Sequence, residues 1–203
     1  MLRYLKIYIF SMFCFSMQVI AQSKVIIISG PSGVGKTTIS NCLVHNKMVE
    51  FFPTTTTRAI RTGEVNGIDY FFISNEEFES RLADFIQPQQ VFGNWYGPDQ
   101  KLLQKKLNTS EKPILMIVTF NLALKMKSLF PGQVITIFIA PPEQNSKFVL
   151  EQRMCLRGES KQSIEKRLQN LEQELSKMNQ ADYVIINDCL EQALQKIQDI
   201  LTT

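Results

Sequence analysis

The sequence has little of what marks a metal-binding, disulfide-stabilised or nucleic-acid-binding protein. Its single histidine, His45, has no partner set for a metal site. The four cysteines show no C-x-x-C spacing and no metal pattern, and they form no recognisable disulfide framework, so we expect free thiols in a reducing compartment. With 22 basic and 19 acidic residues the formal net charge is +3, too small to argue for nucleic acid as a partner. Internal repeats and low-complexity tracts are also lacking.

A hydrophobic run lies near the amino terminus, over residues 7–21, after two basic residues. It ends in Val-Ile-Ala and has the layout of a secretory signal peptide. At about 15 residues it is shorter than the roughly 20 that a membrane-spanning helix needs. Two other interpretations are open: translation starts downstream at Met12 or Met17, or residues 1–23 form an extension that packs on the domain or touches a membrane. Residues 1–23 are therefore left out of the predicted fold.

One motif is specific: G-x-x-x-x-G-K-[ST], from Gly30 to Thr37. A β-branched run over residues 24–29 predicts a buried strand before it, and residues 39–47 predict a helix after it. In such a turn the glycines let backbone N–H groups surround a phosphate, and the helix dipole adds to the attraction. Lys36 would reach the β- and γ-phosphates and the Thr37 hydroxyl would bind Mg²⁺. The sequence predicts an ATP site formed by Gly30, Pro31, Ser32, Gly33, Val34, Gly35, Lys36, Thr37 and Thr38.

Beyond this turn, apolar strands alternate with helices, as in right-handed βαβ units with a parallel sheet. Ser74 and Glu77 form a capping box that starts a helix over residues 75–83, and residues 85–96 read as short antiparallel strands. The other predicted strands are 70–73, 114–119, 134–140 and 183–186, and the predicted helices are 99–108, 122–130, 143–156, 161–178 and 190–201. The expected layout is one α/β domain over residues 24–203, with an insertion at about 54–97.

Several further motifs resemble the guanylate kinase family, from about Lys24 to the carboxyl terminus. They are Thr56-Thr57-Arg58-x-x-Arg61-x-Gly63-Glu64-x-x-Gly67-x-x-Tyr70, Phe92-Gly93-Asn94-Trp95-Tyr96-Gly97, Arg153-Met154-x-x-Arg157-Gly158, Lys166-Arg167-Leu168 and Ile186-Asn187-Asp188. The resemblance implies a P-loop NTPase fold, three α/β/α layers around a five-stranded parallel sheet. It also implies a small mixed-strand insertion that binds GMP, a helical lid at about 143–167, and transfer of the ATP γ-phosphoryl group to GMP with Mg²⁺.

The same resemblance implies a role for each polar side chain of the site. The GMP-binding residues would be Thr54, Arg58, Arg61, Glu64, Tyr70, Gln87 and Tyr96. The catalytic residues would be Lys36, Arg58, Arg153, Arg157 and Arg167, and Asn187 would lie near the adenine. The chemistry agrees, because phosphoryl transfer depends on positioning and cation density, and a planar guanidinium binds phosphate at two points.

The residues that would read the acceptor base depart from the family pattern. Gln87 replaces a glutamate, Pro98 replaces a hydroxyl residue, and Met116 and Val118 replace two aspartates. An unpaired buried polar group costs about 1–3 kcal/mol, so Gln87 alone could weaken GMP about tenfold to a hundredfold. Three interpretations follow: a GMP kinase with weak selectivity, a kinase with altered base specificity such as AMP, or an inactive nucleotide- or protein-binding module.

Because ATP use is hard to reconcile with an exported compartment, we expect a cytoplasmic protein; export or membrane association is the alternative if residues 1–21 act as a signal sequence. ATP and a nucleoside monophosphate, GMP foremost, are the expected partners. Membrane contact is expected only through residues 1–23 if they are retained. No nucleic-acid partner is expected, and the protein could be a monomer or a homodimer.

Overall fold

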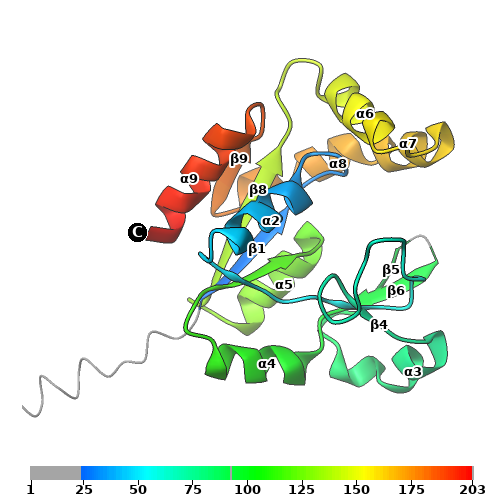
Figure 1. The fold of residues 1–203 in the computed structure, drawn as a ribbon, viewed down its shortest axis with the longest axis vertical. Coiled ribbons are helices and arrows are strands. Elements are labelled where there is room, and N and C mark those ends of the chain that lie inside the picture. Colours follow the sequence, from blue (N-terminus) through cyan, green and yellow to red (C-terminus); the bar gives the residue numbers. More distant parts are fainter. Residues whose placement is uncertain (1–23, 92, 203) are drawn as a thin grey trace, which may run out of the picture.

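A computed structural model describes residues 24–91 and 93–202, so the expectations for residues 1–23 lie outside the described residues. No helix within those two ranges is long and apolar enough to cross a membrane. The chain forms two sheets: a five-stranded core sheet and a four-stranded small sheet (Figure 1).

The core sheet is parallel throughout, in the order β2-β7-β1-β8-β9, and confirms the predicted fold class. Its strands are β1 (Val25–Ser29), β2 (Glu50–Phe51), β7 (Ile114–Ile117), β8 (Val134–Ala140) and β9 (Tyr183–Ile186). The predicted bounds of β8 and β9 are confirmed. The two-residue strand β2 was not predicted, because so short a segment shows no periodicity.

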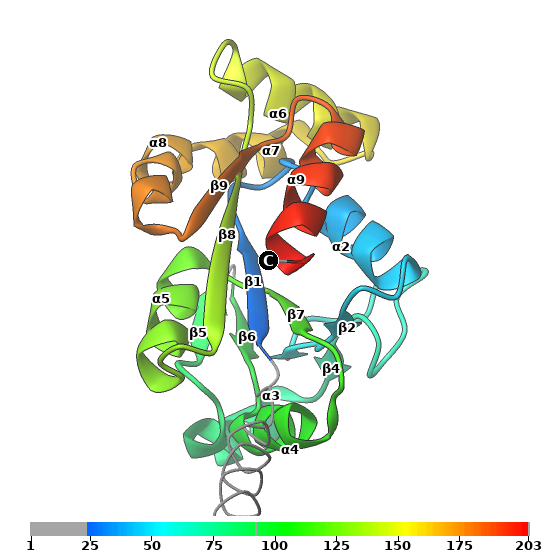
Figure 2. The same ribbon diagram turned by 90° about the vertical axis from the view of Figure 1, so that its left-hand side faces the viewer.

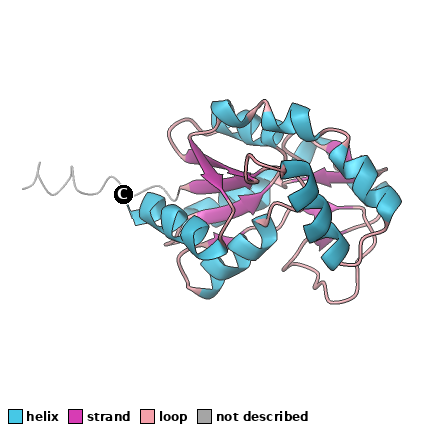
Figure 3. Cartoon of the chain, turned by 90° about the horizontal axis from the view of Figure 1, so that it is seen from above, coloured by secondary structure: helices cyan, strands magenta, loops and turns pink. Residues whose placement is uncertain are grey.

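The side chains of the central strand β1 alternate between two apolar clusters, one on each face of the sheet. Ile26 and Ile28 pack with α2 (Lys36–His45) and α9 (Leu190–Thr202). Val25 and Ile27 pack with α4 (Gln100–Thr109) and α5 (Phe120–Leu129). This two-sided burial explains the unbroken apolar run in the sequence. Figures 2 and 3 show the resulting three layers, with helices on both sides of the strands.

The small sheet, in the order β4-β3-β6-β5, is built by residues between β2 and β7 in the chain. Its strands are β3 (Thr55–Thr56), β4 (Phe71–Phe72), β5 (Gln89–Val91) and β6 (Asn94–Gly97). The antiparallel pair β5–β6 confirms the prediction for residues 85–96, whereas β3 was not predicted. One face is covered by α3 (Asn75–Ser80), whose buried Phe78 stacks on Phe85 at 4.1 Å and on Trp95 at 5.6 Å.

Helix α3 starts as predicted: the Ser74 hydroxyl accepts a hydrogen bond from the Glu77 backbone N–H at 3.1 Å. It stops at Ser80, before a 3-10 turn over Leu82–Asp84, rather than continuing to residue 83.

Three helices lie over the carboxyl end of the core sheet, around the glycine-rich turn: α6 (Ser146–Leu156), α7 (Lys161–Leu168) and α8 (Leu171–Leu175). The prediction of one helix over 161–178 was wrong, since a break follows Leu168 and a 3-10 turn covers Met178–Gln180. Leu168 and Leu171, on either side of the break, lie in the same apolar cluster.

Candidate active site

The glycine-rich turn joins β1 to α2, and close packing requires its glycines. Gly30 has a φ of 136°, and a Cβ there would lie 2.2 Å from the Ile139 carbonyl oxygen. Gly35 has a φ of 104°, and a Cβ there would lie 2.4 Å from Nδ2 of Asn187. Helix α2 begins at Lys36, three residues earlier than predicted, so Lys36 and Thr37 stand at its amino-terminal end.

Lys36 folds back over the turn, where its ammonium donates to the Gly30 carbonyl at 2.6 Å and to the Pro31 carbonyl at 2.8 Å. Burial lowers the pKa of Lys36 from 10.5 to about 8. Glu174 on α8 opposes this shift, and the charges of Arg157 and Arg167 add to it. The charge of the Lys36 ammonium therefore depends on its burial and on these three side chains.

Helices α6 and α7 bring arginines onto the turn. Arg153 donates through Nη2 to the Asn187 carbonyl at 3.0 Å and through Nη1 to the Val34 carbonyl at 3.5 Å. Arg167 donates from Nη1 to the Ser32 hydroxyl at 3.3 Å, and its Nε lies 3.1 Å from Glu159. The positions predicted for the lid thus meet the predicted ATP site.

A cavity of about 350 Å³ opens between α6, the glycine-rich turn and the start of α9. Arg157 and Thr38 line it, and so does Asn187, whose buried amide donates to the Val34 carbonyl at 2.8 Å. The other lining residues are Gly33, Gly35, Arg153, Leu156, Asp188 and Leu190. Its mixture of cationic, amide and apolar groups suits a nucleotide.

A second cationic cluster belongs to the small sheet. Arg58 Nη2 lies 2.7 Å from Glu64 Oε1, and the other oxygen of Glu64 accepts from the Arg61 backbone N–H at 2.9 Å. Burial alone would raise the pKa of Glu64, but these two hydrogen bonds lower it below its usual value. The Arg58 guanidinium sits 5.3 Å from the Tyr70 ring centroid, and Tyr70 packs edge-on against Tyr96 at 6.0 Å. Burial raises the pKa of Tyr70. The cluster is a second candidate phosphate site.

Two of the predicted base-reading positions are neighbours, because the backbone N–H of Ile86, directly before Gln87, donates to the Pro98 carbonyl at 2.9 Å. Met116 is fully buried in the apolar cluster under α4 and α5, and Pro98 is buried. Gln87 is half-buried with a left-handed φ of 44°, just before β5. Thr54 is buried, and Arg61 is exposed.

Sequence reasoning missed two features of this site. Glu174 acts on Lys36 from α8, and the Thr119 hydroxyl donates to Oε1 of Gln89 on β5 at 3.0 Å. No local signal marks either one, because the partners lie far apart in the sequence and meet only through the fold.

Fold and site together define the class, a P-loop α/β protein with one cation cluster on the core sheet and a second on the small sheet. A family model described as guanylate kinase matches residues 22–203, and the chain belongs to the guanylate kinase family.

Named relatives agree with this assignment. A guanylate kinase of Mesoplasma florum is 40% identical over 185 residues, which cover 89% of this chain and 61% of that relative. This chain therefore spans less than two thirds of the length of that relative. A guanylate kinase of Chlorobaculum tepidum is 34% identical and covers 89% of this chain and 92% of its own length. The crystal structure of guanylate kinase from Anaplasma phagocytophilum superposes with a TM-score of 0.69 at 28% identity, covering 90% of this chain and 86% of that one.

Proposed function

We propose that the protein transfers the γ-phosphoryl group of ATP to GMP, producing ADP and GDP. The observation that carries the proposal is the pair of cation clusters, Lys36 with the α6 and α7 arginines on one side and Arg58 with Tyr70 on the other. A binding module needs no such pair, whereas phosphoryl transfer between two phosphate-bearing substrates does. The names of the relatives support GMP as the acceptor.

In the proposed reaction an α-phosphate oxygen of GMP forms a bond to Pγ as the bond from Pγ to the β–γ bridging oxygen breaks. Lys36, Arg153, Arg157 and Arg167 would stabilise the charge on the group in transfer, and Arg58 and Arg61 would hold the acceptor phosphate. The attacking atom is already anionic, so no side chain has to remove a proton.

Magnesium fits this site through Thr37, whose hydroxyl is exposed in the first turn of α2 directly after Lys36. Mg²⁺ prefers oxygen ligands and is held by few side chains together with substrate phosphates. It would supply charge neutralisation between the β- and γ-phosphates.

The α6–α7 segment, at about 143–167, would serve as the lid, and the insertion at about 54–97 would carry the acceptor. We propose a cytoplasmic location, because ATP is a substrate of the proposed reaction. Light scattering would distinguish a monomer from a homodimer.

A coupled assay of ADP release with GMP, dGMP, AMP, IMP and UMP tests the proposal. GMP should be the best acceptor, and Lys36→Met should lower turnover at least about 100-fold. Lys105→Met, at an exposed position on α4, is the matched control and should be neutral. If no acceptor is phosphorylated while ATP still raises the melting temperature, the protein is a binding module.

A further inference from the structure

Gln89 stands on the face of the small sheet that carries the acceptor cluster. In the antiparallel ladder Gln89 pairs directly with Tyr96, and Tyr96 pairs with Thr56 on β3. Residues directly opposite each other share a face, so Gln89 lies on the same side as the Tyr96 ring, which packs on Tyr70 beneath Arg58. The next residue, Gln90, points to the other side, together with Trp95.

Thr119 fixes which end of the Gln89 amide is presented. Thr119 follows β7, the neighbour of β1, and caps α5 by accepting from the Leu122 backbone N–H at 3.4 Å. The same hydroxyl donates its proton to Gln89 Oε1 at 3.0 Å. The contact turns the amide oxygen toward Thr119, so the NH₂ group of Gln89, with its two N–H donors, is directed away from Thr119.

A donor at this position complements one class of purine. Guanine and hypoxanthine carry an acceptor oxygen at position 6, whereas adenine carries a donor amino group there. Pro98 has no hydroxyl for that oxygen, and Gln87 sits outside β5 with a left-handed backbone that interrupts the strand alternation. Gln89 is the polar side chain of β5 on the acceptor face.

We propose that Gln89, held by Thr119, is a specificity-determining residue that donates a hydrogen bond to O6 of the acceptor base. The inference rests on the proposed function and deepens it: 6-oxopurine monophosphates are selected over AMP by an amide from the small sheet and a hydroxyl from the core.

The test compares Gln89→Met, which keeps the length and loses the donor, with Gln90→Met on the opposite face as the matched control. The acceptors are GMP, IMP, AMP and 2-aminopurine riboside monophosphate, which lacks O6. Gln89→Met should lower kcat/KM for GMP and IMP about 3- to 10-fold and leave that for AMP and the 2-aminopurine nucleotide unchanged. Gln90→Met should change none of them.

Thr119 is tested as a positioning residue. Thr119→Val should lower the GMP-to-AMP ratio of kcat/KM, because the freed amide can turn its oxygen toward the base, and Thr119→Ser should restore the ratio. A uniform change for all four acceptors would show that the contact merely holds the two sheets together and would overturn the proposal.

Equilibrium binding of the same nucleotides separates this inference from the proposed function. A wild-type protein that turns over no acceptor contradicts the kinase proposal. Gln89→Met should then still weaken GMP and IMP binding alone, and equal binding of all four nucleotides to both proteins would overturn the role of Gln89.

Discussion

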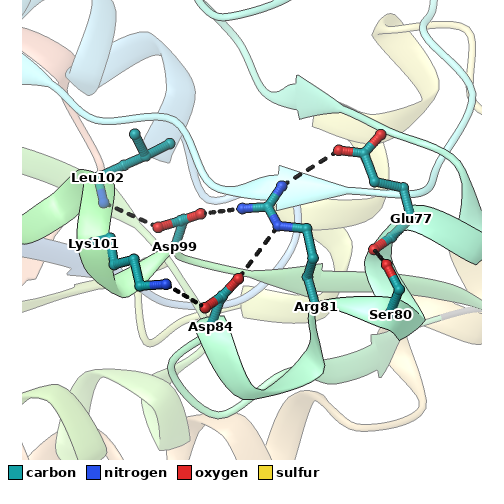
Figure 4. A network of polar contacts seen from close by, with 7 residues as sticks. All are labelled: Glu77, Ser80, Arg81, Asp84, Asp99, Lys101 and Leu102. Carbon is teal, nitrogen blue, oxygen red and sulfur yellow. Dashed lines mark hydrogen bonds and ion pairs between the residues drawn. The ribbon is translucent and has the colours of Figure 1, made fainter.

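The guanidinium of Arg81 lies 2.5 Å from the carboxylate of Asp99 (Figure 4). Arg81 closes α3, and Asp99 caps α4 by accepting from the Leu102 backbone N–H at 2.9 Å. The Asp99 carboxylate is buried, at 4% exposure, and Arg81 also reaches Asp84 and Glu77. The Asp99 carboxylate therefore caps a helix that packs on the core sheet and also forms an ion pair with Arg81, which belongs to the segment that carries the small sheet.

Removing Arg81 should destabilise the fold. Arg81→Met leaves the Asp99 carboxylate buried with its helix-cap partner alone, so the free energy of unfolding should fall by about 1–2 kcal/mol. Lys101→Met is the control, because Lys101 is 82% exposed and its ion pair with Asp84 is worth little. Urea denaturation measures both variants. Equal effects of the two would show that the Arg81–Asp99 contact contributes nothing of its own.

Gly97→Ala should disturb the core of the small-sheet unit. A Cβ at Gly97 would lie 2.9 Å from Cβ of Phe85 and 3.4 Å from the Phe78 ring. Overpacking of this kind costs about 1–3 kcal/mol, and the shift of Phe85 should reach the strand that carries Tyr96. We expect a lower melting temperature and a higher KM for GMP. Gln90→Ala, at an exposed position of the same sheet, should leave both values unchanged.

The lowered pKa of Lys36 predicts a dependence of stability on pH. Between about pH 8 and 10.5 the unfolded chain keeps the Lys36 proton and the folded chain has lost it, so this group makes stability rise with pH. From pH 7 to pH 9 the wild type should gain about 1 kcal/mol relative to Lys36→Met. The measurement is the free energy of unfolding of both ligand-free proteins at each pH. If it changes equally in the wild type and in Lys36→Met, the pKa of Lys36 is not lowered in the folded protein.

Glu64 should affect the acceptor without affecting the donor. Glu64→Gln weakens the charged contact that orients Arg58 against Tyr70, so KM for GMP should rise about 3- to 10-fold while KM for ATP stays constant. Steady-state kinetics with each substrate varied in turn measures the difference. Asp69→Asn is the neighbouring control, because the Asp69 carboxylate accepts from the Val65 backbone N–H at 2.8 Å within the same loop. If KM for ATP rises by the same factor, Glu64 does not act through the acceptor site alone and the prediction is wrong.

Long apolar segments made most of the fold predictable. Strands β8 and β9 have the predicted bounds because each is a continuous run between clear breaks. The two-residue strands β2 and β3 carry no pattern of their own, and pairing defines them: β2 pairs with β7, and β3 with β4 and β6. The break after Leu168 was not predictable, because the sequence has no glycine or proline there to signal it.

In the candidate site, too, the local features could be predicted from the sequence and the long-range contacts could not. The turn from Gly30 to Thr37 is a local motif, so its ligand class follows from its spacing together with the strand and the helix that flank it. Gln89 and Thr119 are 30 residues apart in the sequence and belong to different parts of the fold, so no spacing rule predicts their contact.

Arg58, on the small sheet, and Arg153, on α6, differ in their partners. Arg58 is matched by the carboxylate of Glu64, whereas Arg153 donates to the main-chain oxygens of Val34 and Asn187, which carry no net charge. The field of Arg153 thus extends outward into solution, and the field of Arg58 is largely cancelled within the protein. An uncancelled positive field attracts an approaching polyanion from a distance, and salt screens this attraction over about 10 Å at 0.1 M. Capture of ATP should therefore slow more steeply with ionic strength than capture of the monophosphate.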